Sequence, residues 1–320
     1  MNITADFINT NTDFNTLIEK LRKGFAKNEI IVPMRHHHDF LNEYSMEPTT
    51  MLLMPAWHPN QNSGVKIVTV SPDNYKWNLP SIQGSYLFMD TKTGMVKAII
   101  EAKALTAKRT AAASALAADY LAKTSANSLL VIGTGALAPN LIKAHCSIRP
   151  IKTVYVWGRQ LAKAEKICEQ FVNANFEIKA VETIESIISK VDIISCATLS
   201  KTPLVLGKYL QKGQHVDLVG SFKPDMRESD NEVMRRANIF VDTFEGSTKE
   251  SGDLVIPLQE KVIVKSDIKS DLFDLCNGSK QGRKSDDEIT VFKSVGHALE
   301  DLVAAEYYFE SYSEAPASEK

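Results

Sequence analysis

Cysteine is scarce in this chain of 320 residues. The four cysteines are scattered along the sequence, and no two of them form a C-x-x-C pair; they are Cys146, Cys168, Cys196 and Cys276. This spacing provides neither a disulfide-stapled scaffold nor the paired thiolates of a structural zinc site. We therefore interpret them as reduced thiols of a cytoplasmic protein.

An excess of charge of one sign is also missing. Lys and Arg number 37 and Asp and Glu number 39, which leaves a net charge of −2. No stretch of the chain is a block of Lys and Arg. Because nucleic-acid-binding proteins usually carry a basic excess, the sequence predicts no nucleic-acid partner.

Secretory signals and long apolar segments are absent as well. The first residues, MNITADFINTNTDF, contain neither the positive segment nor the apolar segment of a secretory signal. The longest apolar stretches, such as residues 128–139, fall short of the roughly 20 residues that a membrane span needs. We therefore expect a cytoplasmic protein with no membrane partner.

What the chain does contain is typical of a globular protein, with 44% hydrophobic and 24% charged residues. Its length allows about two domains of roughly 150 residues. A helix is predicted over 14–28, followed by strands at 51–56, 64–70, 84–90 and 95–101. An Ala-rich helix over 105–124 then leads into a different pattern.

The second pattern alternates short apolar strands with helices. Strands are predicted at 129–132, 153–157, 193–196, 215–219 and 239–242, and helices at 161–172, 185–189, 269–276 and 294–309. Short continuous runs of Val, Ile and Leu between helices are typical of a parallel sheet that is buried on both faces. The sequence therefore predicts an α/β fold.

A glycine-rich turn follows the first of these apolar strands. Its residues match G-x-G-x-x-G/A and are Gly133, Thr134, Gly135, Ala136, Leu137 and Ala138. The first glycine suits a tight turn, and the second lets the backbone approach a pyrophosphate. The alternative is an ordinary turn, but the flanking strand and helix favour a dinucleotide site over positions 133–137.

The end of the next strand indicates which dinucleotide is bound. Gly158 and Arg159 stand there, with Lys163 one helical turn later, whereas NAD-selective folds usually have an acidic residue. A guanidinium can pair with a 2′-phosphate through two hydrogen bonds. We therefore expect NADPH as cofactor. NADH is the alternative if Arg159 is only a solvated loop residue.

Three further stretches resemble a known family. They are LTAKRTAAASALAA (105–118), VGSFKPDMRESD (219–230) and TVFKSVGHALEDLVAA (290–305). Together with LLMPAW, GVKIVTV and the glycine turn, they resemble the ornithine cyclodeaminase/mu-crystallin family, and most of all its Δ1-pyrroline-2-carboxylate reductase branch. The resemblance implies a Rossmann-type domain over 116–294. It also implies an α+β substrate and dimerisation domain, made of 1–115 with 295–320, and hence a homodimer.

The resemblance also implies site residues. The family's substrate-carboxylate and catalytic positions fall on Arg35, Lys66, Arg109 and Asp225. Arginine forks suit the carboxylate of an amino or imino acid, and a lysine beside two arginines is driven toward its neutral form. By residue type alone, Lys66 is an ordinary strand residue and Asp225 a turn carboxylate. Further cofactor contacts implied by the resemblance are Thr198, Leu199, Ser221, Val295 and His297.

The run His36-His37-His38 could be taken for a metal site. Adjacent residues of an extended segment point in different directions and do not easily share one ion. We predict no metal, and we regard one of the three histidines as a candidate for lining the substrate pocket.

Three functions follow from the resemblance. The first is reduction of Δ1-pyrroline-2-carboxylate to L-proline, or of Δ1-piperideine-2-carboxylate to L-pipecolate, with Asp225 or Lys66 as proton donor. The second is ornithine cyclodeaminase, which would convert L-ornithine to L-proline and ammonia. That activity is disfavoured by Leu52, which stands where the cyclodeaminases have a glutamate, and by the missing acid near Arg159. The third is a non-catalytic small-molecule binding protein of the mu-crystallin type.

Overall fold

The computed structural model describes residues 1–41, 43–45 and 47–316. The chain divides into two compact units, one made of Met1–Arg109 with His297–Lys320 and the other of Thr110–Gly296. The chain passes from the first unit to the second inside one helix, α3 (Ala102–Leu121). The expected boundaries, after residues 115 and 294, differ by a few residues. Since α3 contains neither Gly nor Pro, the sequence does not mark where the helix changes unit.

The first unit is built on a six-stranded sheet with the order β1-β6-β5-β4-β3-β2. Its strands are β1 (Asn2–Ile3), β2 (His36–Phe40), β3 (Thr49–Trp57), β4 (Asn62–Val70), β5 (Ile82–Asp90) and β6 (Val96–Glu101). All neighbours are antiparallel except β1 and β6. The sheet matches the four predicted strands, and β1 and β2 are additions to them.

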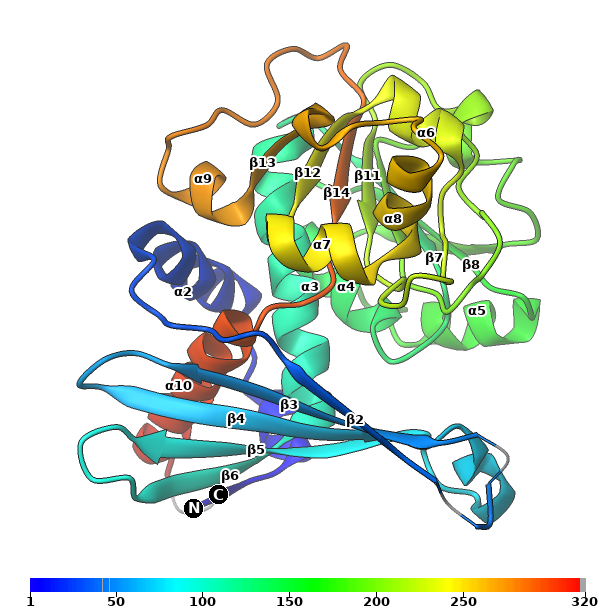
Figure 1. Cartoon of the computed structure of the whole chain (residues 1–320). Helices are drawn as coiled ribbons and strands as arrows, with labels where there is room; N and C mark the ends of the chain where they lie inside the picture. Colours follow the sequence, from blue (N-terminus) through cyan, green and yellow to red (C-terminus); the bar gives the residue numbers. More distant parts are fainter. Residues whose placement is uncertain (42, 46, 317–320) are drawn as a thin grey trace. The chain divides into compact units, whose positions relative to one another are not determined.

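The first unit also contains helices, and one of them lies against a face of this sheet. They are α1 (Ala5–Thr10), α2 (Phe14–Lys27) and α10 (Ala298–Glu314), with a 3-10 turn η1 at Pro72–Trp77. Helix α10 packs against β3, β4 and β5, and it also contacts α2 (Figure 1). Gly24 allows that close approach, because a Cβ there would stand 2.9 Å from a methyl group of Val303.

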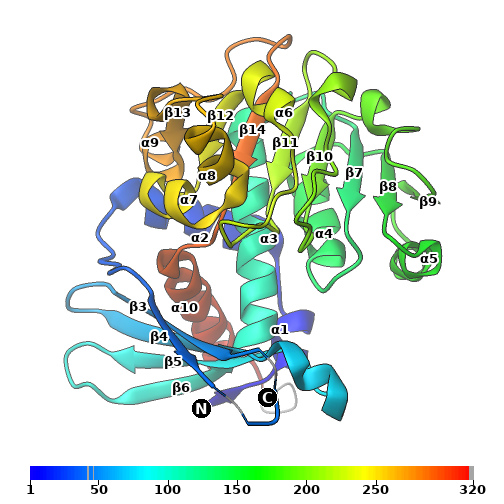
Figure 2. The same cartoon turned by 45° about the vertical axis from the view of Figure 1, so that its right-hand side comes forward.

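The second unit contains an eight-stranded parallel sheet with the order β13-β12-β14-β11-β10-β7-β8-β9 (Figure 2). The strands are β7 (Ser128–Ile132), β8 (Thr153–Trp157), β9 (Glu177–Val181), β10 (Ile193–Cys196), β11 (His215–Leu218), β12 (Asn238–Val241), β13 (Ile268–Asp271) and β14 (Thr290–Lys293). The helices are α4 (Ala138–Ile148), α5 (Leu161–Glu169), α6 (Asn231–Arg236), α7 (Phe244–Glu250), α8 (Gly252–Gln259) and α9 (Leu272–Cys276), with 3-10 turns η2 (Ile188–Lys190), η3 (Gly207–Tyr209) and η4 (Lys265–Asp267).

Strand β7 shows why these strands read as continuous apolar runs. Leu129 and Val131 belong to the apolar core on one face of the sheet, and Leu130 and Ile132 belong to the core on the other. Since successive side chains of a strand point to opposite faces, a sheet with helices on both sides needs apolar residues at every position. The predicted α/β fold with a parallel sheet is confirmed.

Three helix predictions after residue 180 are wrong in detail. The helix expected over 185–189 is only the 3-10 turn η2. The segment expected as a helix from 269 begins with strand β13 and becomes helical at Leu272, where the Asp271 side chain accepts from the Asp274 N–H. The last helix starts at Ala298 instead of 294, after strand β14. Strands of four residues are too short for periodicity to separate them from a helix, so only their pairing with neighbours decides.

Candidate functional site

Four buried, charged side chains meet in the first unit. The Lys66 Nζ lies 2.8 Å from the carboxylate of Asp301. Arg109 Nε donates to Asp301 Oδ1 at 2.8 Å, and its Nη1 donates to Glu300 Oε2 at 2.6 Å. The exposed fraction of Lys66 is 2% and that of Arg109 is 4%, while both carboxylates are fully buried. Asp301 therefore joins the two cations that the sequence had marked separately.

The local structure explains why these side chains face one another. Lys66 is the middle residue of β4 and pairs across the sheet with Met54 and Tyr86, so its side chain shares the face of the buried Gly64 and Val68. The carboxylates belong to the first turn of α10, where the unpaired N–H groups of a helix favour negative charge.

Burial shapes the protonation of this cluster. It lowers the pKa of Lys66 to about 8, the positive charges of Arg109 and Arg35 lower it too, and Asp301 opposes them. Burial by itself raises the pKa of Asp301, but Arg109 and Lys66 outweigh it, and the net shift is downward. The carboxylate thus stays ionised, while the lysine keeps its proton at neutral pH and loses it as the pH rises through about 8.

Arg35 stands directly before β2 and is half-buried. It is near enough to Lys66 for its charge to lower the pKa of that lysine. Arg35, Lys66 and Arg109 bring three positive charges against two negative ones on Glu300 and Asp301. The balance leaves one positive charge for the carboxylate of a bound ligand.

The sequence reading missed Glu300 and Asp301. The signal that could have found them is the pair of adjacent acids in GHALEDLVAA, at the start of an otherwise apolar helix. Fully buried acids are rare unless they are paired, so two acids in a helix predicted to be buried require cations nearby.

Asp225 belongs to the second unit and is in a different environment. Its side chain is 58% exposed, and Oδ2 lies 2.6 Å from Lys201 Nζ. This hydrogen bond lowers the pKa of Asp225. The carboxylate is therefore ionised at neutral pH. An ionised carboxylate has no proton to give, which argues against Asp225 as the proton donor that the resemblance implies.

The glycine-rich turn lies at the carboxyl end of β7, between β8 on one side and β10 on the other. Gly133 has a φ of +125°, and a Cβ there would stand 2.5 Å from the carbonyl oxygen of Ala197. A Cβ on Gly158 would stand 2.5 Å from the Thr134 side chain. Gly133 therefore has to be glycine, because neither its φ nor the Ala197 carbonyl allows a side chain. A Cβ on Gly135 would meet nothing within 4 Å, so the second glycine of the turn faces open space.

A cavity of about 500 Å³ opens at this turn. Its lining includes seven of the predicted cofactor residues, namely Gly133, Thr134, Gly135, Gly158, Arg159, Thr198 and Leu199. The loops concerned follow β7, β8 and β10, where the strand order changes direction, which is the usual ligand position in open α/β sheets. Arg159 brings positive charge to the lining, Lys201 is paired there with Asp225, and none of the described residues that line the cavity is acidic.

The other predicted cofactor residues are not among the described residues that line this cavity. Ala136 and Leu137 lie between the turn and α4, and Lys163 lies in the first turn of α5. The Ser221 hydroxyl is buried and donates to the Met226 carbonyl, and the Val295 N–H donates to Asp242. His297 belongs to the first unit, where its ring lies 6.5 Å from that of Phe25.

The three histidines lie on β2, an edge strand, and alternate between its faces. His37 pairs with Leu52, which pairs with Val68, so His37 is on the sheet face that carries Lys66. His36 and His38 are on the other face, with ring centroids 6.2 Å apart. Within the described part of the chain, no group of three or more His, Cys, Asp or Glu side chains is placed to hold a metal ion.

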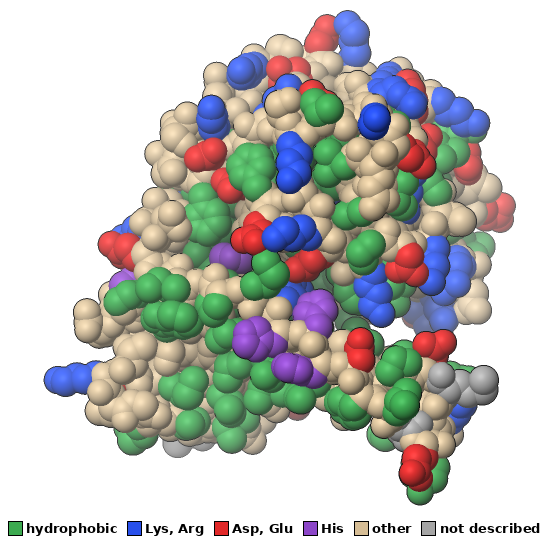
Figure 3. Space-filling model, in the orientation of Figure 1, with side chains coloured by type: hydrophobic (Ala, Val, Ile, Leu, Met, Phe, Trp, Pro, Cys, Tyr) green, Lys and Arg blue, Asp and Glu red, His purple; other side chains and the backbone are tan. Residues whose placement is uncertain are grey.

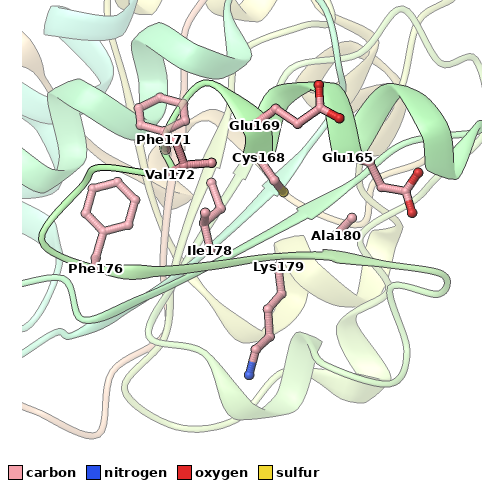
Figure 4. Close-up of a pocket in the computed structure, with 9 residues that line it drawn as sticks. All are labelled: Glu165, Cys168, Glu169, Phe171, Val172, Phe176, Ile178, Lys179 and Ala180. Carbon is pink, nitrogen blue, oxygen red and sulfur yellow. The ribbon is translucent and has the colours of Figure 1, made fainter.

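A second cavity, of about 590 Å³, lies between α5 and β9 (Figure 4). It is lined mainly by apolar side chains, with Cys168 at its centre, and the Lys179 side chain extends away on the other side of the strand. Burial raises the pKa of the Cys168 thiol, which makes it a poor nucleophile. None of the predicted site residues lines this cavity.

The fold, the charged cluster around Lys66 and the glycine-rich turn at Gly133 together define a class of protein. A parallel sheet with a glycine-rich turn at the point where its strand order reverses is the architecture of dinucleotide-binding proteins. The ornithine cyclodeaminase/mu-crystallin family model matches residues 3–315, and the chain belongs to that family.

The chain is similar to individual members of known identity over nearly its whole length. The chain is 37% identical to Protein SAR DEFICIENT 4 of Arabidopsis thaliana, over 93% of either protein. It is 36% identical to the Δ1-pyrroline-2-carboxylate reductase of Colwellia psychrerythraea, over 95% of this chain and 96% of that one. A solved structure of the Thermococcus litoralis Δ1-pyrroline-2-carboxylate reductase, in complex with NADH and L-proline, is similar with a TM-score of 0.92 at 33% identity, over 98% of either chain.

Proposed function

We propose that this protein is an NAD(P)H-dependent reductase that converts Δ1-pyrroline-2-carboxylate to L-proline, and that it also accepts the six-membered Δ1-piperideine-2-carboxylate. The observation that carries the proposal is the buried cluster of Lys66, Arg109 and Asp301. Its excess positive charge fits a small ligand with one carboxylate. The similar reductases from C. psychrerythraea and T. litoralis support the choice of substrate.

The residues of the cluster have distinct parts in this proposal. Arg109 and Arg35 hold the substrate carboxylate, so that the imine lies at a fixed place beside Lys66. Lys66 Nζ donates a proton to the imine nitrogen, for which a pKa of about 8 is suitable at neutral pH. Asp301 orients both cations. When bound, a reduced nicotinamide dinucleotide supplies the hydride that the imine carbon accepts.

The cofactor is the second part of the proposal. The cavity at Gly133 suits a dinucleotide because the backbone at Gly135 faces open space and because Arg159 in the lining can attract an anion. With Arg159 in the lining and no acid beside it, we infer that NADPH is preferred over NADH.

The two alternative functions have weaker support. Leu52 shares the face of Lys66, through its pairing with Val68, so a carboxylate at this position would point toward the cluster and a leucine cannot replace it in cyclodeaminase chemistry. A purely binding role does not require a buried lysine whose pKa lies near neutrality.

We also infer a homodimer, formed through the sheet of the first unit. The face away from α10 is apolar along its strands, with Leu53, Ile67, Leu87 and Ile99 at alternating positions. Figure 3 shows hydrophobic side chains gathered over this part of the molecule. An apolar sheet face of this extent is covered in a stable protein, and a second copy of the chain is the occupant that we propose. Ile67→Lys, which puts a charge on this face, should give a monomer in analytical ultracentrifugation.

Cellular location is a further inference. Among the described residues, no helix is long and apolar enough to cross a membrane. All four cysteines are free thiols, and we infer a cytoplasmic enzyme.

One assay tests the reaction. Purified protein is given Δ1-pyrroline-2-carboxylate with NADPH, and separately ornithine with NAD⁺, and absorbance of the reduced nicotinamide is followed alongside proline and ammonia. We expect one NADPH consumed per proline formed in the first mixture. Proline and ammonia from ornithine at equal or greater catalytic efficiency would overturn the proposal.

A further inference from the structure

Glu228 is a fully buried acid in the second unit, in the segment between β11 and α6. Each of its oxygens accepts two hydrogen bonds. Oε1 accepts from the N–H of Thr198 at 2.7 Å and from its hydroxyl at 3.0 Å. Oε2 accepts from the N–H groups of Gly220 at 2.7 Å and Ser221 at 3.2 Å. One carboxylate therefore connects the loop after β10 to the loop after β11.

The first of these loops is a wall of the cavity at the glycine-rich turn. Thr198 lines that cavity, and its neighbour Ala197 is the residue whose carbonyl leaves no room for a side chain on Gly133. The loops are also in close contact with each other, because a Cβ on Gly220 would stand 2.0 Å from the Thr198 carbonyl oxygen. A shift of Thr198 would therefore change both the wall and the turn.

Charged and titratable groups surround Glu228 on three elements. The Lys293 Nζ on β14 lies 4.0 Å away, and Asp253 on α8 accepts from the Glu228 N–H at 2.9 Å. Cys196 on β10 is the third neighbour. Burial raises the pKa of Glu228 to about 7, with Lys293 opposing and Asp253 adding to the shift. Such a buried acid is costly, so the four hydrogen bonds that it accepts are what offset its burial.

We infer that Glu228 is a positioning residue of the dinucleotide site: its carboxylate holds the loops after β10 and β11 together and so fixes Thr198 at the cavity wall before the cofactor arrives. This inference rests on the proposed function, because it requires that the cavity binds the cofactor. A preorganised wall binds more tightly, since no loop has to be ordered on binding.

Glu228→Gln tests the inference. The amide has the same shape but only one acceptor oxygen, so its NH₂ group must face two of the four donors. We expect the Kd for NADPH to rise about ten- to hundredfold, as for the loss of charge-assisted hydrogen bonds. The kcat at saturating NADPH and the KM for the imine should stay within about threefold. Amide hydrogen exchange of Thr198, Gly220 and Ser221 should accelerate.

Asp192→Asn is the matched control. Asp192 accepts from the N–H groups of Asn127 and Ser128 and from the Ser128 hydroxyl, so it also ties two segments of the same sheet together, but at the amino ends of β7 and β10. We expect this variant to lose stability in urea denaturation while keeping its Kd for NADPH.

Three results distinguish a failure of the proposed function from a failure of the inference about Glu228. If the unaltered protein binds neither NADPH nor NADH in a fluorescence titration, the proposed function fails, and the inference fails with it. If it binds but Glu228→Gln binds equally well, only the inference is wrong. If Glu228→Gln and Asp192→Asn weaken binding to the same extent, the effect is general destabilisation and the inference is wrong as well.

Discussion

The Nζ of Lys66 lies 2.8 Å from the carboxylate of Asp301, although 235 positions of the sequence separate the two residues. Both side chains are buried, and Arg109 shares the same carboxylate. The first unit has one segment before the parallel-sheet unit in the sequence and one after it. The buried ion pairs of Asp301 with Lys66 and Arg109 join these two segments in the candidate active site.

Removal of this carboxylate should be costly. In Asp301→Asn, the buried positive charges of Lys66 and Arg109 lose the negative charge that balances them. Removing one partner of a buried ion pair typically lowers the free energy of unfolding by about 3–5 kcal/mol. We expect a lower free energy of unfolding by that order, measured by urea denaturation. Glu310→Gln is the control on the same helix. Its carboxylate pairs with Lys20 at the surface, so its loss should have almost no effect. Equal stability of the two variants would contradict the role of Asp301.

The pH dependence of kcat should follow the loss of the proton from Lys66. Because burial lowers its pKa to about 8, the lysine loses its proton as the pH rises through that value. If its ammonium group is the proton donor, kcat falls above about pH 8 and is constant below it. A Lys66→Arg variant keeps its charge to much higher pH, so this fall should vanish from its profile. The same fall in both proteins would assign the titration to another group.

The same shift makes a prediction for stability. Between pH 8 and the ordinary lysine value of 10.5, the folded protein binds fewer protons at Lys66 than the unfolded chain does. The contribution of Lys66 to the free energy of unfolding should therefore rise with pH over this window. Lys66→Met should remove that rise, which urea denaturation at pH 7.5 and pH 10 can detect. A parallel pH trend in the variant would show that the lysine is not the source.

The proton donor can be identified by a pair of variants. Asp225 is exposed and paired with Lys201, so Asp225→Asn should leave kcat within a few-fold of the parent. Lys66→Met should lower kcat by about 10²–10⁴, the usual range for loss of general acid–base assistance. Steady-state assays at saturating imine and NADPH measure both kcat values. If instead Asp225→Asn lowers kcat far more than Lys66→Met does, Asp225 is the proton donor.

Cofactor choice should depend on Arg159. Arg159→Ala should weaken NADPH binding about ten- to hundredfold, since a charge-assisted contact with the 2′-phosphate is lost, and should leave NADH nearly unchanged. Lys166→Ala, an exposed lysine on the following helix, serves as control and should affect neither cofactor. If Arg159→Ala weakens the binding of NADPH and NADH equally, the guanidinium does not recognise the 2′-phosphate.

Local patterns were enough to predict the parallel sheet and the dinucleotide turn. The apolar runs at β7, β8 and β10 and the spacing of Gly133 and Gly135 are properties of adjacent residues, so they can be read along the chain. The four-residue strands β13 and β14 could not be predicted in this way, because their conformation depends on pairing with β12 and β11.

The sequence by itself determined the fold class, the nucleotide turn and the basic residues Arg35, Lys66 and Arg109, because composition, spacing and family resemblance carry that information. Only the tertiary structure decided which groups control their chemistry. It brought Asp301 to Lys66, left Asp225 exposed beside Lys201, and placed four donors around Glu228. The physical reason is that pKa and hydrogen bonding depend on distance and burial, and both are set by contacts between residues far apart in the chain.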